Sequence, residues 1–133
     1  AQPSREHVSE LGLLSATHPP LRRAGSQVAI GPAGSGSPFH FHNGALNALG
    51  FGEKRWLLLP PAAAQFSAED VWAWATAEGR ARLAELAAAG ELLQCDQRAG
   101  DLLFVPKMWG HAVVNTRASV GVAVEFSAPW EPG

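Results

Sequence analysis

The chain has 133 residues, of which 47% are hydrophobic and 17% charged, and its formal net charge is −2. This length suits one domain and is enough to bury roughly two thirds of the surface of the unfolded chain. The absence of a basic excess argues against a nucleic-acid-binding protein. No apolar run approaches the roughly 20 residues of a membrane span.

Two further counts limit the class of protein. A single cysteine, Cys95, excludes a disulfide within the chain. Fourteen glycines and ten prolines, with helix-like spacing only in the middle of the chain, favour many short strands over a helical bundle. Because the chain begins with Ala1, we expect it to be a processed or excised piece of a longer product. The sequence settles neither the compartment nor the oligomeric state.

The chain divides into an N-terminal segment and a β domain. Residues 1–26 are polar and irregular, and we expect at most a short helix there, capped by Ser4. Short strands separated by turn residues should follow within 27–128. They are expected at 27–30, 40–42, 46–51, 54–59, 92–97, 102–106, 111–116 and 119–126. Two groups of four strands predict a mainly β domain built as a double-sheet jelly roll.

A helical insertion, about 67–90, is expected between the two halves of the domain. Ser67 and Asp70 form an imperfect capping box, and apolar residues then recur near helical spacing. Gly79 is expected to divide the insertion into two short helices, of which the second ends at Gly90.

The first candidate site lies in segment 34–61, which reads GSGSPFHFHNGALNALGFGEKRWLLLPP. In a strand, a period of two residues places His40 and His42 on one face, and Phe39 and Phe41 on the other. The alternative is that both phenylalanines face the core while both histidines face water.

A third histidine, His111, opens a later strand. The same period places His111, Val113 and Asn115 on one face of that strand. If His40 and His42 point into the jelly roll, His111 is expected to meet them from the opposite sheet. Three neutral imidazoles can bind a divalent first-row metal and leave further coordination positions open.

A buried cation is expected in the same interior. Alternation places Lys54 on one face with Trp56, and an inward lysine is unfavourable unless it meets an anion. The alternative, in which Arg55 points inward instead, is no less unfavourable. Asn47 and Asn115 add amide donors. Together with a metal, these groups describe a pocket for a small dicarboxylate, one end of which chelates the metal while the other pairs with the cation.

These segments resemble the jumonji-C (JmjC) oxygenases of the cupin superfamily. The resemblance is carried by GSGSPFHFH, GEKRWLLLPP and AGDLLFVPKMWGHAVVNT, and it covers about residues 27–128. The last of these segments also meets the general cupin pattern G-x5-P-x4-H-x3-N, through Gly100, Pro106, His111 and Asn115. The resemblance implies a double-stranded β-helix and an oxidation that depends on Fe(II) and 2-oxoglutarate. The small JmjC hydroxylases are the most similar in pattern, which implies a protein or peptide side chain as substrate.

The resemblance also implies roles for individual residues. His40 and His111 match metal ligands. Lys54, in the segment GEKRW, matches the residue that binds the distal carboxylate of 2-oxoglutarate, helped by Ser37. Asn47 and Asn115 match positions that line the cosubstrate pocket.

The chain departs from the family pattern at residue 42. JmjC oxygenases usually carry H-x-D or H-x-E, whose carboxylate completes a triad of two histidines and one acid. Here that position is His42, a neutral ligand that leaves the metal site one unit more positive. Asp101 sits at a turn and Glu125 lies late in the last strand, so neither is expected to replace the acid. The expected metal ligands are therefore His40, His42 and His111.

Three classes of function remain open. The first, which we favour, is a 2-oxoglutarate oxygenase that hydroxylates a protein side chain. The second is an impaired JmjC fold that acts as a binding module, with its metal structural or absent, and His42 favours it. The third is a three-histidine cupin enzyme that acts on a small molecule without 2-oxoglutarate, and Lys54 argues against it. Loops 31–38 and 106–110 are expected to contact the substrate, but their sequence does not identify it.

Overall fold

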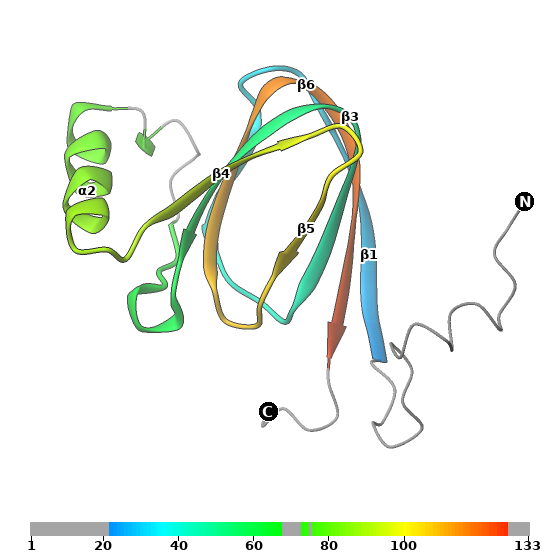
Figure 1. The fold of residues 1–133 in the computed structure, drawn as a ribbon, viewed down its shortest axis with the longest axis horizontal. Helices are drawn as coiled ribbons and strands as arrows, with labels where there is room; N and C mark the ends of the chain where they lie inside the picture. The colour runs from blue at the N-terminus through cyan, green and yellow to red at the C-terminus, as the bar shows by residue number, and fades with distance from the viewer. Residues whose placement is uncertain (1–21, 68–72, 75, 128–133) are drawn as a thin grey trace, which may run out of the picture.

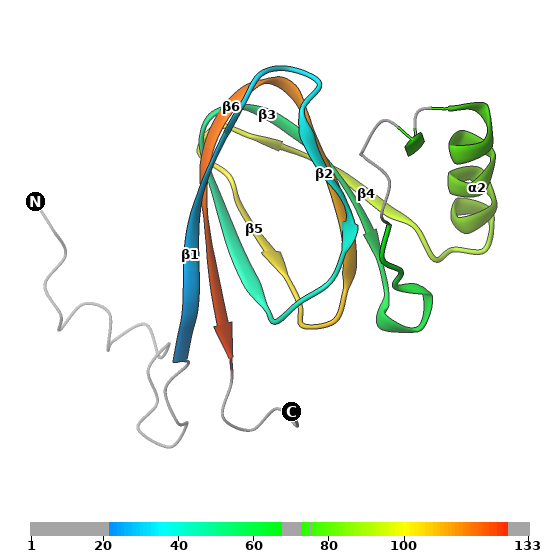
Figure 2. The ribbon, with the colours of Figure 1, turned by 180° about the vertical axis from the view of Figure 1, so that it is seen from behind.

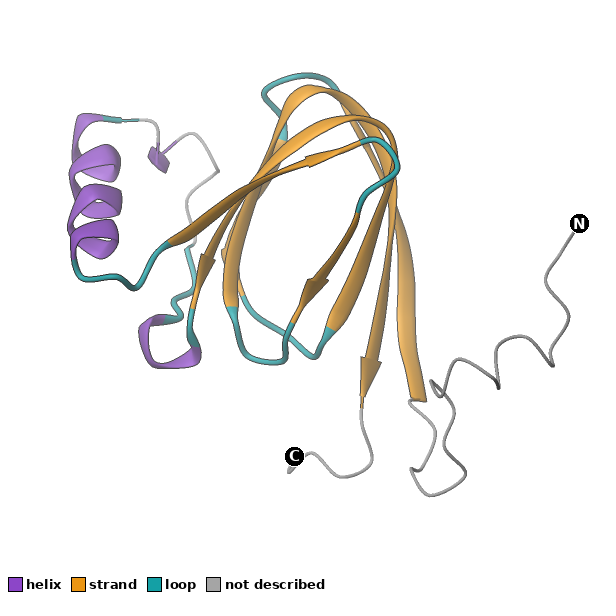
Figure 3. Ribbon diagram, in the orientation of Figure 1, coloured by secondary structure: helices purple, strands orange, loops and turns teal. Residues whose placement is uncertain are grey.

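The computed structural model describes residues 22–67, 73–74 and 76–127. The helix expected after Ser4 therefore lies outside the described residues, and so does Asp70 of the expected capping box. Strands make up most of the described chain, and α2 (Ala77–Ala88) is its one α-helix (Figure 3). Among the described helices, none has the length and apolar character that a membrane crossing needs.

The described strands form a jelly roll built on two long strands. They are β1 (Arg22–Gly31), β2 (Gly36–His40), β3 (Ala45–Leu59), β4 (Leu93–Arg98), β5 (Leu102–Val105) and β6 (Gly110–Ser127). β3 and β6 pair antiparallel along their whole length. β1 and β2 each pair with one end of β6, and β5 and β4 each pair with one end of β3. The roll thus has two halves, one with β1 and β5 and the other with β2 and β4 (Figures 1 and 2).

Several strand boundaries differ from those predicted. The predicted pair 46–51 and 54–59 is the single strand β3, and the predicted pair 111–116 and 119–126 is the single strand β6. Each long strand serves both halves of the roll, which explains why the sequence shows eight strand-like segments. β1 begins at Arg22, which is earlier than the strand predicted to start at residue 27.

The expected turn at Gly52 is instead an irregularity within β3. The pairing of β3 with β6 shifts between Leu49 and Lys54, and Gly52 has a φ of 89°. A Cβ at this position would overlap the carbonyl oxygen of Ala118, so the close approach of the two strands requires glycine. The shift also changes the alternation. Leu49 is buried while Phe51 is 60% exposed, although simple alternation would place the two side chains on one face.

α2 lies in the segment between β3 and β4, after a short 3-10 turn, η1 (Pro61–Ala63). Thr76 caps α2 by accepting a hydrogen bond from the backbone N–H of Gly79 at 3.1 Å. Gly79 therefore lies in the first turn of α2. The prediction that it divides two helices is wrong. Leu86 of α2 packs in a buried cluster with Phe39, Leu59 and Ala112. Through Leu86, the helix thus contacts the outer face of the half that contains β2 and β4.

The outer face of the other half is apolar. Val28 and Ile30 of β1 are 68% and 76% exposed, and their cross-strand partners Val122 and Val120 of β6 are 41% and 40% exposed. No helix among the described residues covers them. The inner face of the roll holds a second buried cluster, formed by Trp56, Leu58 and Val105. The candidate site lies beside this inner cluster.

Candidate metal centre

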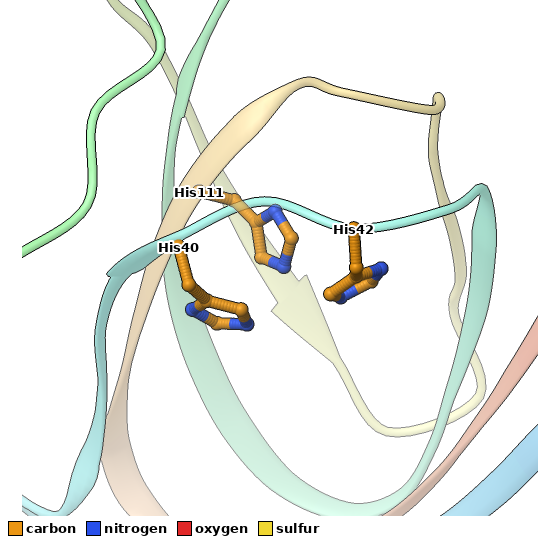
Figure 4. Close-up of side chains that lie close together, drawn as sticks. All are labelled: His40, His42 and His111. Carbon is orange, nitrogen blue, oxygen red and sulfur yellow. The ribbon is translucent and has the colours of Figure 1, made fainter. Parts of the chain in front are cut away.

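Three histidines meet on the inner face of the roll. His40 ends β2 and pairs directly with His111 of β6, while His42 lies just beyond β2. Their possible ligand atoms all lie within 4.8 Å of one another. Figure 4 shows one nitrogen of each ring turned toward the space between the three rings. We predicted that His111 would come from the opposite sheet. Because β2 is hydrogen-bonded to β6, His111 instead comes from the neighbouring strand.

The position of His42 depends on a turn elsewhere in the chain. We predicted that strand alternation places His42 on the same face as His40. β2 ends at His40, so alternation cannot be what holds His42 on the inner face. Instead its carbonyl oxygen accepts a hydrogen bond of 2.9 Å from the backbone N–H of Met108. Met108 has a φ of 63°, which is uncommon for a residue other than glycine, and it lies in the turn between β5 and β6. That turn braces the loop that carries His42. His40 and His42 line a partly open cavity and are partly buried, so they do not face bulk water as the alternative predicted, whereas its prediction that Phe39 faces the core is confirmed.

A backbone carbonyl orients each imidazole ring. A carbonyl oxygen can only accept a hydrogen bond, so each ring nitrogen that contacts one must carry the proton. The Nδ1 atoms of His40, His42 and His111 lie 2.7, 2.6 and 3.0 Å from the carbonyl oxygens of Pro38, Asn43 and Trp109. In the neutral rings, Nε2 then keeps its lone pair for a metal, as in many metal sites where the second ring nitrogen is held by an outer partner.

The residues fit a divalent metal. His111 is only 3% exposed, and this burial is the main cause that lowers its pKa to about 4, so the ring is neutral at pH 7. Adjacent nitrogens that bind one ion at about 2.1 Å are about 3.0–3.4 Å apart, so the three ligand atoms, which lie within 4.8 Å of one another, would move closer together on an ion. Three imidazoles suit a first-row metal such as iron.

The histidines line a cavity of about 560 Å³ inside the roll. This volume is within the usual range for a small-molecule site. Among the described residues that line the cavity, Lys54 is the only cationic side chain and Glu125 the only acidic one. The residues that the sequence predicts for the cosubstrate also line it, namely Ser37, Asn47, Lys54 and Asn115.

Lys54 faces this cavity without an acidic partner. Lys54 and Trp56 are 8% and 4% exposed, whereas Arg55 points outward and its Nε donates to Asp96 at 2.8 Å. The predicted inward face of Lys54 is confirmed, and the alternative with Arg55 inward is wrong. Burial lowers the pKa of Lys54, and within the described residues no carboxylate pairs with it. An anion bound in the cavity would therefore stabilise the charged form of Lys54.

The pairing of β3 with β6 separates this cation from the histidines. Lys54 lies opposite Asn115, and Leu58 lies opposite His111. At about 3.3 Å per residue, the two pairs are roughly 13 Å apart along the strands. Lys54 and the histidines therefore enter the cavity at different levels, which suits a ligand with an anionic group at each end.

Two polar side chains that support the cavity wall could not be identified as part of the site from the sequence. Ser35 Oγ accepts a hydrogen bond of 2.9 Å from Asn115 Nδ2. Gln97 is 3% exposed, and its Oε1 accepts a hydrogen bond of 2.9 Å from Trp56 Nε1. Gln97 Nε2 donates to the carbonyl oxygens of Asn47 and Asp101, at 2.9 and 3.2 Å. Alternation in β4 could have placed Gln97 inward, but nothing in the sequence identifies its partners.

Replacing Gln97 should destabilise the fold. Gln97→Ala is expected to lower the free energy of unfolding by about 2–4 kcal/mol, because it leaves the Trp56 indole N–H and two carbonyls without their partner. Gln94→Ala, at an exposed position of the same strand, is the matched control and should change stability by less than about 0.5 kcal/mol. Denaturant unfolding of both variants measures the difference, and equal stabilities would show that Gln97 does not support the wall.

Comparisons with known proteins bear on this site. No protein-family model matches the chain. JmjC domain-containing protein 8 from Mus musculus is 34% identical over 111 residues, which are 79% of this chain and 40% of that protein. The 2-oxoglutarate and iron-dependent oxygenase JMJD4 from Danio rerio is 33% identical over 105 residues, which are 71% of this chain and 25% of that protein. The chain belongs to the JmjC domain family. The predicted family is confirmed, with H-x-H where its members usually carry H-x-D or H-x-E.

Solved structures agree on the fold of this JmjC domain. The ribosomal oxygenase YcfD from Escherichia coli, in complex with cobalt and 2-oxoglutarate, matches with a TM-score of 0.56 at 16% identity. The match covers 81% of this chain and 24% of the YcfD chain. At this identity the likeness shows the fold alone, which is the predicted double-stranded β-helix of the cupin superfamily. The JmjC domain spans less than half the length of the curated relatives named above.

Proposed function

We propose that this JmjC domain is an Fe(II)- and 2-oxoglutarate-dependent oxygenase that hydroxylates a side chain of a protein or peptide. The observation that carries the proposal is one cavity with three convergent imidazole nitrogens at one level and an unpaired, buried lysine at another. The names of two matched proteins support it. JMJD4 is a 2-oxoglutarate and iron-dependent oxygenase, and YcfD is a ribosomal oxygenase solved with cobalt and 2-oxoglutarate.

The side chains of the cavity divide into two groups by role. His40, His42 and His111 hold the metal through Nε2, because their Nδ1 atoms are engaged by backbone carbonyls. Lys54 pairs with the distal carboxylate of 2-oxoglutarate, and the buried indole of Trp56 beside it limits water, which strengthens the pairing. The remaining polar lining consists of Ser37, Asn47 and Asn115. When bound, Fe(II) and 2-oxoglutarate supply the oxidation of the substrate by oxygen.

A second candidate function is a binding module that has lost catalysis. The observation that favours it is His42, which stands where the family usually places a carboxylate ligand. A neutral imidazole there leaves the metal with less anionic stabilisation, although the cavity and its lysine are retained. A three-histidine enzyme that does not use 2-oxoglutarate is less consistent with an inward Lys54 that meets no acidic side chain among the described residues.

His42→Asp tests how the proposed oxygenase depends on residue 42, because a working His42 and an impairing His42 predict opposite changes in succinate production. If His42 is a working ligand, the substitution should reduce conversion of 2-oxoglutarate to succinate with Fe(II) and oxygen. If His42 has impaired the site, the restored carboxylate should increase that conversion. We expect a slow oxygenase: the parent protein binds metal and forms succinate slowly, and His42→Asp is faster. A binding module would form no succinate until the carboxylate is restored. His42→Asn, which has the shape of aspartate without its charge, is the matched control and should show no gain.

Succinate production by the three proteins decides between the two functions. Rapid turnover by the parent that His42→Asp destroys would contradict our expectation and identify three histidines as the active ligand set. An equal gain in His42→Asn would show that size and not charge matters at this position.

A further inference from the structure

Glu125 lies in the same cavity, beside the one ligand that departs from the family pattern. It projects from β6 and is the only acidic side chain among the described residues that line the cavity. Its Oε1 atom is 3.9 Å from Nδ1 of His42. Glu125 pairs with Ala45, at the start of β3, so the sheet register fixes its backbone close to the loop that carries His42.

Within the described part of the chain, His42 is the only side chain that forms an ion pair with Glu125, and it does so only when its ring is protonated. Neither side chain is freely solvated, because Glu125 is 32% and His42 31% exposed. A partly buried carboxylate without a cationic partner is unfavourable in the metal-free protein, because it has lost part of its hydration without a compensating contact. A divalent cation held by the three histidines would provide that compensation.

The distances indicate how Glu125 would act on the metal. At 3.9 Å, Oε1 is too far from His42 Nδ1 for a hydrogen bond, and the Nδ1 proton already points to the carbonyl oxygen of Asn43 at 2.6 Å. Glu125 is also absent from the group of ligand atoms that lie within 4.8 Å of one another. It therefore acts through its charge on the His42 ring and on the metal behind that ring. A negative charge at this distance attracts a bound metal cation through space and so strengthens metal binding.

We propose that Glu125 is a positioning residue that supplies, from outside the ligand set, the negative charge that His42 does not provide. This inference rests on the proposed function to the extent that it requires a metal at the three histidines. The family pattern places the negative charge on the metal itself. In this chain it would stand one imidazole ring away, where its attraction for the metal is weaker than that of a ligating carboxylate.

Metal titration tests the role of Glu125 without any measurement of activity. Metal-free protein is titrated with Co(II) in a calorimeter, and the parent is compared with Glu125→Gln, which removes the charge and keeps the shape. Glu125→Gln is expected to bind Co(II) about 10-fold more weakly, the lower end of the effect of removing an outer partner of a metal-binding histidine, because no hydrogen bond to the ring is lost. Glu91→Gln, an exposed position between α2 and β4, is the matched control and should bind as the parent does.

Two further variants distinguish a charge effect from a structural one. Glu125→Asp keeps the charge and should bind Co(II) much more tightly than Glu125→Gln. In the His42→Asp background, the ligand itself carries the charge and a second carboxylate beside it is repelled. There Glu125→Gln should cease to weaken Co(II) binding. Unfolding midpoints measured without metal confirm that each variant is folded.

Each outcome of this experiment has one reading. If the parent does not bind Co(II), the proposed metal centre fails and the inference fails with it. If the parent binds and Glu125→Gln binds equally well, only the inference is overturned. Complete loss of binding in Glu125→Gln would make Glu125 a ligand and would also overturn it. The same weakening by Glu125→Gln with histidine or aspartate at position 42 would show that the effect is not charge compensation.

Discussion

His111→Ala is expected to abolish metal binding. The substitution removes the most deeply buried of the three imidazoles and leaves two ligands, of which His42 is held only by a loop. Ligand nitrogens in the parent should lie about 2.0–2.3 Å from the ion, with the zinc distance as a guide. Binding by the parent should weaken as the pH falls, because imidazolium cannot ligate. Metal analysis after loading with Fe(II) or Mn(II) and dialysis measures the effect.

The control for this variant lies on the same strand. Arg117→Ala, at an exposed position of β6, should retain the metal content of the parent. Equal metal content in His111→Ala and the parent would end the proposal of a metal centre at the three histidines.

Lys54→Ala is expected to weaken the binding of 2-oxoglutarate to the metal-loaded protein by about 3 kcal/mol, or roughly a hundredfold. The substitution removes the only cationic side chain among the described residues that line the cavity, so the distal carboxylate would be partly buried without a partner. Lys54→Arg should do little better, because the larger planar guanidinium needs different room. Calorimetry with the metal-loaded proteins measures both affinities.

The neighbouring residue provides a matched control. Arg55 is also cationic, but it points outward and pairs with Asp96, so Arg55→Ala should leave 2-oxoglutarate binding unchanged. Equal affinities of Lys54→Ala and the parent would contradict the role of Lys54. If even the metal-loaded parent bound no 2-oxoglutarate, the binding module would become the better description of this JmjC domain.

The sequence by itself determined the features that depend on local periodicity. Alternation within one strand placed Lys54 and Trp56 on the inner face, and it placed His111 with Asn115. Such a pattern requires only that the segment be extended, because side chains of a strand alternate whatever its partners are. The motif segments that carry the JmjC resemblance are local in the same sense. They sufficed for the family, the fold class and the departure at His42.

Only the tertiary structure decided how these segments pair. The bulge at Gly52 makes β3 one long strand and turns Phe51 outward, which simple alternation across the glycine could not predict. The register of β2 against β6 sets His40 beside His111 in the same half of the roll. Pairing and bulges depend on hydrogen bonds between segments far apart in the chain, and a period of two residues carries no information about them.

Tertiary contacts also determine which groups surround the site. A turn between β5 and β6 braces His42 through Met108, and β6 brings Glu125 to within 3.9 Å of the His42 ring. Gln97 joins the wall of the cavity through Trp56. In each case the two partners lie far apart in the sequence, and their contact follows from the closure of the roll. The sequence therefore contained the candidate ligands, whereas only the folded chain shows which groups surround them.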